Sequence, residues 1–329
     1  MSTTKQTQRI DFIDLAKGVC ILLIVIGHCG VNINILGYNT TVMPAFYVLS
    51  GLFFKTYGGV KSLIIKKINK ILIPFLFFYL VGNVAFYAIK LFAPQLLITD
   101  ARGIFDMFDN RQFFNGPIWF LLCLFWCNIY FYIISTYIKK ESLRIAVIAL
   151  LGFIGWFLGD KEIFVSLFLD VAMTTLPFFA FGYYLKKSNI LYPNKADKYN
   201  ISIAIILWII ALIIESQSSN LRVSFHYNHI SLLAYITSIT STISFIFLCK
   251  SIKKLPFFSY IGKYSIILLC VHHMIYRPVI VLLQATNIEI INNAYIVSVI
   301  TLFLSTLCIP LCIKFIPWFV ARKDLIKEK

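Results

Sequence analysis

Long apolar runs separated by short polar connections dominate the pattern along this chain. A helix needs about 20 mostly apolar residues to cross the hydrocarbon core of a membrane. The runs predict ten transmembrane helices, at residues 11–31, 41–57, 71–93, 116–138, 143–159, 166–185, 200–214, 230–249, 264–283 and 294–313. They lack the strict apolar–polar alternation of barrel strands. We therefore expect an all-α polytopic membrane protein in which residues 1–329 form a single membrane domain.

Composition agrees with this pattern and excludes most other classes. The chain is 60% hydrophobic and 13% charged, whereas soluble proteins are about 45–50% apolar and about 25% charged. Its net charge of +16 comes from short basic clusters between apolar runs, which is typical of topology signals and of contact with anionic lipid headgroups rather than of nucleic-acid binding.

The positions of the basic residues also predict an orientation. Most of the 30 Lys and Arg residues lie near the two termini and in alternate connections, whereas the remaining connections carry five: Arg102, Arg111, Lys161, Arg222 and Arg277. Because cytoplasmic loops carry an excess of Lys and Arg, both termini are expected in the cytoplasm. The longest external connection, 94–115, contains acids, amides, aromatic residues and Arg111, so we count Arg111 among the residues expected near an acceptor site.

The first span contains the most informative residues. Asp14, Lys17 and His28 lie within an otherwise apolar run, and charges inside a span require a partner or an aqueous cavity. The step from Lys17 to His28 comes within about 20° of three full helical turns, and Asp14 lies on a neighbouring part of that face. One stripe therefore carries all three groups, with Lys17 and His28 about 16 Å apart along the axis. An imidazole that titrates near neutrality is a suitable general base.

Five short motifs resemble those of the bacterial membrane-bound acyltransferase 3 family, and they occur in the family's order. They are Asp14, Lys17-Gly18 and His28; Phe46-Tyr47-Val-Leu-Ser50-Gly51; the basic run Lys66-Lys67-Ile-Asn-Lys70 before Pro74; Gly116-Pro117-Ile-Trp119-Phe-Leu; and Ile261-Gly262-Lys263-Tyr264-Ser265 followed by His272. Lys17 stands where the family more often has Arg, so it keeps the charge without the bidentate geometry. The compact chain most resembles the fucose 4-O-acetylase-like branch of polysaccharide O-acetyltransferases.

The resemblance implies transfer of an acetyl group from acetyl-CoA, a co-substrate rather than a bound cofactor, to a hydroxyl of a cell-surface or lipid-linked glycan. It also implies a bacterial cytoplasmic membrane location. His28 is then expected to act as general base or transient acyl carrier, and Asp14 and Lys17, on the same helix face, are expected to belong to the catalytic site with it. The CoA phosphates are expected to contact Arg9, Lys66, Lys67 and Lys70.

Further polar residues are expected around the reaction chamber. Ser50 and His272 are expected to line it, and Trp119 to stack on a sugar ring. His226 and His229 have no third metal ligand nearby in the sequence, so they are not assigned to a site, and no metal is expected.

Two other classes fit part of the pattern. A polysaccharide-precursor transporter or flippase would also have many spans and intramembrane charge, but the chain has no internal symmetry or matched pair of broken spans. A scaffold without chemistry leaves the stripe of Asp14, Lys17 and His28 unexplained. Acetyl-CoA turnover separates the enzyme from both, and the sequence predicts no particular oligomeric state.

Overall fold

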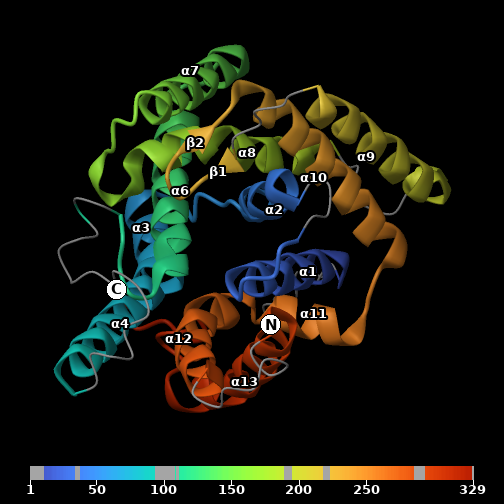
Figure 1. The fold of residues 1–329 in the computed structure, drawn as a ribbon. Helices are drawn as coiled ribbons and strands as arrows, with labels where there is room; N and C mark the ends of the chain where they lie inside the picture. The colour runs from blue at the N-terminus through green and yellow to red at the C-terminus, as the bar shows by residue number, and fades with distance from the viewer. Residues whose placement is uncertain are drawn as a thin grey trace, which may run out of the picture.

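The computed structural model describes residues 11–33, 38–92, 108, 111–188, 195–217, 223–284 and 293–327, and these form mainly helices (Figure 1). The longer helices are α1 (Asp11–His28), α2 (Tyr38–Leu52), α4 (Ile73–Phe92), α6 (Trp119–Tyr137), α7 (Glu141–Asp160), α8 (Leu169–Lys187), α9 (Asn200–Ser216), α10 (Leu232–Ile252), α12 (Ser265–Gln284) and α13 (Ala294–Phe315). Two shorter helices are α3 (Val60–Lys67) and α11 (Pro256–Lys263). Strands β1 (Val223–Ser224) and β2 (His229–Ile230) pair antiparallel as a small hairpin.

Eight helical stretches within the described residues are long and apolar enough to cross a membrane. They identify an all-α polytopic membrane protein, as the sequence predicts. The other two predicted spans, 11–31 and 41–57, also form helices, but α1 carries Asp11, Asp14 and Lys17 in its 18 residues, and α2 has only 15 residues. The number of ten spans and the cytoplasmic location of the termini remain predictions.

Three local features differ from the predicted plan. The helix predicted at 71–93 begins earlier, because α3 continues through a π-helical turn (Ile68–Leu72) into α4. The basic run therefore lies on a helix and not in a connection. The segment before the predicted span 264–283 forms the separate helix α11, which ends at Lys263. The hairpin of β1 and β2 was not predicted, since each strand has only two residues.

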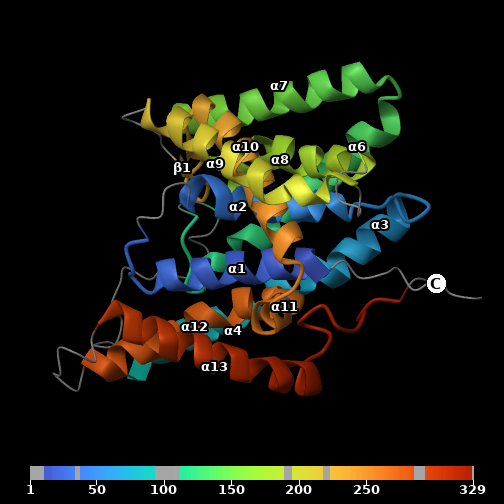
Figure 2. The ribbon, with the colours of Figure 1, turned by 90° about the vertical axis from the view of Figure 1, so that its right-hand side faces the viewer.

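Helix α1 lies in the interior of the bundle. It contacts α2 and α10 on one side and α11, α12 and α13 on the other. Figures 1 and 2 show this arrangement, with α7 to α10 and α2 on one side of α1 and with α11 to α13 on the other. The stripe that carries Lys17 and His28 is therefore surrounded by protein over much of its length.

Two pairs of helices cross with their backbones in contact. A Cβ atom at Gly18 would overlap the Phe258 carbonyl of α11, and one at Gly262 would overlap the Asp14 carbonyl of α1. The same relation joins Gly51 of α2 to Gly182 of α8. Small residues allow such close approach between apolar helices. Gly18 directly follows Lys17, and Gly51 directly follows Ser50, so each crossing fixes the helix beside a predicted site residue.

Candidate functional site

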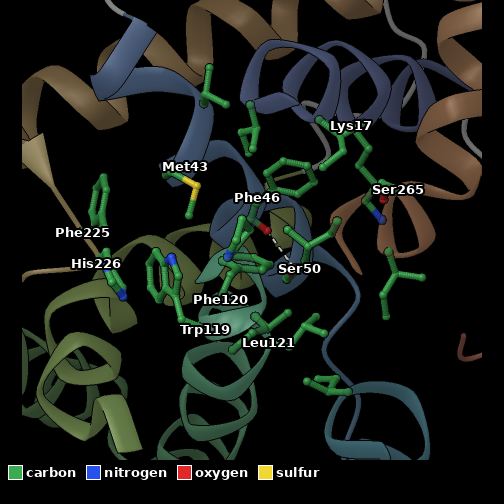
Figure 3. A pocket seen from close by; sticks show the side chains of 18 of the residues that line it. Lys17, Met43, Phe46, Ser50, Trp119, Phe120, Leu121, Phe225, His226 and Ser265 are labelled. Carbon is green, nitrogen blue, oxygen red and sulfur yellow. Dashed lines mark hydrogen bonds between the residues drawn. The ribbon is translucent and has the colours of Figure 1, made fainter. Parts of the chain in front are cut away.

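A cavity of about 370 Å³ lies against the inner face of α1. Helix α2, the π-helical turn, the start of α6, the β1 end of the hairpin and α12 form its other walls. Figure 3 shows Lys17 and Ser265 toward one end, and Trp119, Phe225 and His226 toward the other. Apolar side chains line much of the wall between the ends: Ile21, Ile24, Met43, Phe46, Phe120 and Leu124.

His28 is part of the cavity wall and forms a pair with His272 of α12. Its Nδ1 atom lies 3.0 Å from Nε2 of His272, and the two ring planes differ by 5°. His272 is fully buried, whereas the side chain of His28 remains exposed. The residues are 244 positions apart in the sequence, and the packing of α1 against α12 brings them together.

The hydrogen bonds of this pair determine where the protons lie when both rings are neutral. The Nδ1 atom of His272 lies 2.7 Å from the carbonyl oxygen of Leu268. A carbonyl only accepts, so His272 donates from Nδ1 and its Nε2 atom is left as an acceptor. His28 must then donate from Nδ1 to that atom. Its Nε2 atom consequently has no proton and presents a lone pair, which is the form that a general base or a nucleophile requires.

Lys17 lines the same cavity, which agrees with the predicted stripe. Its ammonium lies 4.9 Å from the centre of the Phe53 ring. Asp14 is half-buried on α1, one turn before Lys17, and it does not line the cavity. The structure thus brings Lys17 and His28 to one cavity and leaves Asp14 beside it, where its backbone forms part of the crossing with α11.

The predicted basic cluster is divided by the structure. Lys70 lines the cavity, and both Lys66 and Lys70 contact the Asp324 carboxylate, at 2.7 and 2.8 Å. Lys67 lies over the ring of Tyr57. Arg9, the fourth predicted donor contact, falls outside the described residues.

Ser50 lines the cavity wall on α2. Its hydroxyl donates to the Phe46 carbonyl over 2.7 Å, as the dashed line in Figure 3 shows. Serines in helices commonly bond to the preceding turn in this way. The contact leaves the oxygen lone pairs of Ser50 as acceptors beside the cavity.

Aromatic rings surround the cavity at the end opposite Lys17. Trp119 stacks on Phe168, with ring centres 5.6 Å apart, and His226 lies 5.5 Å from each of them. His226 donates from Nε2 to the Arg111 carbonyl over 2.8 Å, which leaves its Nδ1 lone pair as an acceptor. Burial lowers the pKa of His226 to about 4, and the nearby charge of Arg111 acts in the same direction. A neutral imidazole therefore stands beside Trp119.

Arg111 lies beside the cavity, next to His226, and does not line its wall. Its guanidinium lies 2.5 Å from the Asp170 carboxylate, in an ion pair that is almost fully buried. Asn228 donates to the same carboxylate over 2.9 Å and to the Gly155 carbonyl over 2.8 Å. The Arg111 side chain therefore joins α7, α8 and the hairpin beside the cavity rather than lining it. Two contacts join Arg111 to a wall residue, His226: the Arg111 backbone carbonyl accepts from the His226 ring, and the Arg111 guanidinium donates to the His226 carbonyl over 3.4 Å.

His226 is a wall residue that the sequence analysis left unassigned. The sequence places it in a connection between two spans, and its role depends on the hairpin and on Arg111, 115 positions away. The sequence signal that could have pointed to His226 is the Phe-His-Tyr-Asn-His stretch, in which aromatic residues stand next to imidazoles. Among the described residues, no group of three or more His, Cys, Asp or Glu side chains is arranged to hold a metal ion.

Comparison with protein families gives a match over most of the chain. Residues 10–315 match the acyltransferase domain that defines the acyltransferase 3 family. Comparison with curated proteins gives no match, and neither does comparison with solved structures. The matched region contains every cavity-lining residue and both glycine crossings. The chain therefore belongs to the acyltransferase 3 family, and it is a multi-pass membrane acyltransferase.

Proposed function

We propose that the chain transfers an acetyl group from cytoplasmic acetyl-CoA to a hydroxyl of a cell-surface or lipid-linked glycan in a bacterial cytoplasmic membrane. The observation that carries the proposal is the His28–His272 hydrogen bond in the wall of a cavity that Lys17 and Lys70 also line. An oriented imidazole at one end and cations at the other match the needs of a hydroxyl nucleophile and an anionic donor.

The donor enters from the end of Lys17 and Lys70, where its phosphates contact ammonium groups. The separation of about 16 Å between Lys17 and His28 along α1 is comparable to an extended pantetheine arm. The thioester then reaches His28 while the nucleotide stays at the cytoplasmic face. The apolar residues between the two ends contact the methylene and methyl groups of that arm.

In the general-base route, Nε2 of His28 accepts the proton of the acceptor hydroxyl while the oxygen attacks the thioester carbonyl. The carbon–sulfur bond breaks, and the departing sulfur takes up the proton from His28. His272 accepts from Nδ1 of His28 throughout, so it orients the ring and stabilises the transient imidazolium. In the alternative route, Nε2 attacks the thioester carbonyl, the carbon–sulfur bond breaks and CoA leaves as a thiolate. The acceptor hydroxyl then attacks the acetyl carbon, the bond to Nε2 breaks, and the hydroxyl proton passes to the thiolate. Acetyl-His28 found by mass spectrometry after rapid mixing without acceptor would identify this second route.

The acceptor occupies the end formed by Trp119 and His226. Sugar rings pack their apolar faces on aromatic side chains, and their hydroxyls require acceptors and donors nearby. The lone pair on Nδ1 of His226 and the exposed ring of His28 supply two acceptors. Trp119 supplies the apolar surface.

The test compares His28→Ala with the wild type, both purified in nanodiscs, by measuring thiol release from acetyl-CoA with and without a glycan acceptor. We expect a loss of about 10²- to 10⁴-fold, the usual contribution of an acid–base group. His229→Ala is the matched control, since His229 lies on the hairpin outside the cavity wall, and it should retain wild-type turnover.

Two substitutions at His272 sharpen the test. His272→Gln keeps an acceptor for His28, whereas His272→Phe removes it, so the glutamine variant should retain more activity. Equal turnover by well-folded wild type and His28→Ala would overturn the mechanism. A folded wild type that fails to bind acetyl-CoA would favour a precursor transporter.

A further inference from the structure

The segment after α13 returns across the bundle and packs on the basic helix, by which we mean α3 and the π-helical turn that follows it, with Lys66, Lys67 and Lys70. We name residues 321–326 the C-terminal strap. Figure 2 shows this part of the chain running from α13 past α11 toward α3. The strap lies beyond residue 315, where the family match ends, so no family motif describes it.

Specific contacts hold the strap at both sides of the donor end of the cavity. On the α3 side, the backbone amides of Leu325 and Ile326 donate to Oδ1 of Asn69 over 2.7 and 2.9 Å. On the other side, Arg322 donates to the Lys263 carbonyl and lies 4.2 Å from the centre of the Tyr264 ring. Lys70 lines the cavity next to Asn69, and Ser265 lines it next to Tyr264. The strap therefore spans the two walls at that end.

Asp324 is the acidic residue of the strap, and it occupies the basic cluster. Its two carboxylate oxygens lie 2.7 Å from the Lys66 ammonium and 2.8 Å from that of Lys70. Lys70 also donates to the Ala321 carbonyl over 3.0 Å. A carboxylate held between two ammonium groups shows that the cluster accepts an anion. It is also the position at which the proposed function requires the donor phosphates.

We propose that Asp324 is an internal ligand of a phosphate site, and that the phosphate groups of the donor displace it and release the strap. This inference rests on the proposed function for the identity of the donor. Both ion pairs are about one-third exposed, and pairs of that kind contribute little to stability. A phosphate group carries more charge and more acceptor oxygens than a carboxylate. Displacement is therefore favourable once a polyphosphate ligand is present.

The decisive measurement is hydrogen exchange of the peptide that contains Leu325 and Ile326, in the full chain in nanodiscs. These amides should be protected without ligand, because they are bonded to Asn69. Acetyl-CoA and inorganic pyrophosphate should both abolish the protection. S-acetylpantetheine, which has the same thioester arm and no phosphate, should leave it in place.

Asp324→Asn provides the second arm, because it removes the competing charge and keeps the shape of the side chain. We expect the Kd for acetyl-CoA to fall about fivefold, as expected when an exposed ion pair is lost. Glu141→Gln is the matched control. It neutralises the exposed partner of Lys187, in another connection predicted to be cytoplasmic, and should leave the Kd unchanged.

The outcomes separate this proposal from the proposed function. Protection that persists at saturating acetyl-CoA, or an unchanged Kd in Asp324→Asn, overturns the strap and leaves acyl transfer standing. If acetyl-CoA does not bind, the hydrogen-exchange result with pyrophosphate separates the remaining cases. Loss of protection in the strap supports a phosphate site that serves a different donor. Protection that persists with pyrophosphate overturns the phosphate site as well.

Discussion

At the residue scale, the central chemical feature is the imidazole of His28, whose Nε2 atom carries no proton. The Leu268 carbonyl fixes the tautomer of His272, and His272 in turn fixes that of His28. Sequence spacing predicted that Lys17 and His28 share a helix face, and in the structure both line one cavity. Spacing within one helix could not predict the orientation of the His28 ring, because that depends on a residue in a different helix.

His226 provides a pH-dependent prediction outside the spans. Burial lowers its pKa to about 4 from 6.5, so between these values the unfolded chain binds a proton that the folded chain does not. The stabilising effect of the neutral ring is complete above the higher value and is lost as the pH falls through the lower one. We expect the thermal midpoint of the wild type to fall with acidification across this window more steeply than that of His226→Gln. Parallel midpoint curves for the two proteins would contradict this assignment.

At the element scale, the glycine crossings explain two motif positions that carry no chemistry of their own. Gly18 and Gly51 follow Lys17 and Ser50, and in both places the neighbouring helix backbone occupies the space of a side chain. The crossings hold α1 against α11 and α2 against α8, and thereby set the positions of two cavity walls.

Gly18→Ala should therefore lower the free energy of unfolding by more than a glycine-to-alanine change does where the added methyl group has space. The added Cβ must separate α1 from the Phe258 carbonyl, and overpacking of this kind destabilises by about 1–3 kcal/mol. The midpoint temperature of thermal unfolding and the turnover rate should both fall. Gly59→Ala serves as control, because a Cβ there meets open space. If the Gly18 and Gly59 variants have equal midpoints, the crossing does not constrain the helices.

The spans with long uninterrupted apolar runs were predictable as helices, because chain length and apolarity suffice to identify them. The break between α11 and α12 and the hairpin of β1 and β2 were not, since neither has a strong local pattern. The strap was also beyond prediction. Its contacts join Asn69 to residues more than 250 positions later, and no local periodicity encodes such a pairing.

At the scale of the whole molecule, the predicted orientation gives the proposed reaction a direction. The basic helix and the strap lie toward one end of the cavity and the hairpin toward the other, and the Lys and Arg distribution predicts the cytoplasm at the basic end. Acetyl-CoA does not cross membranes. Inverted vesicles, which expose the cytoplasmic face, should therefore consume added acetyl-CoA, and right-side-out vesicles should not. Detergent should make the two preparations equal. Consumption by intact right-side-out vesicles would require the reverse orientation.

The apolar stretch between the two ends of the cavity has a consequence for the fidelity of the proposed reaction. A thioester held beside an activated imidazole is as reactive toward water as toward a sugar, so competition with hydrolysis determines the yield. Phe46, Phe120, Ile21 and Ile24 offer water no hydrogen-bond partner along that stretch, and excluding water from an active site suppresses such side reactions. The same side chains that give the cavity its shape would then set how many acetyl groups are delivered for each one wasted.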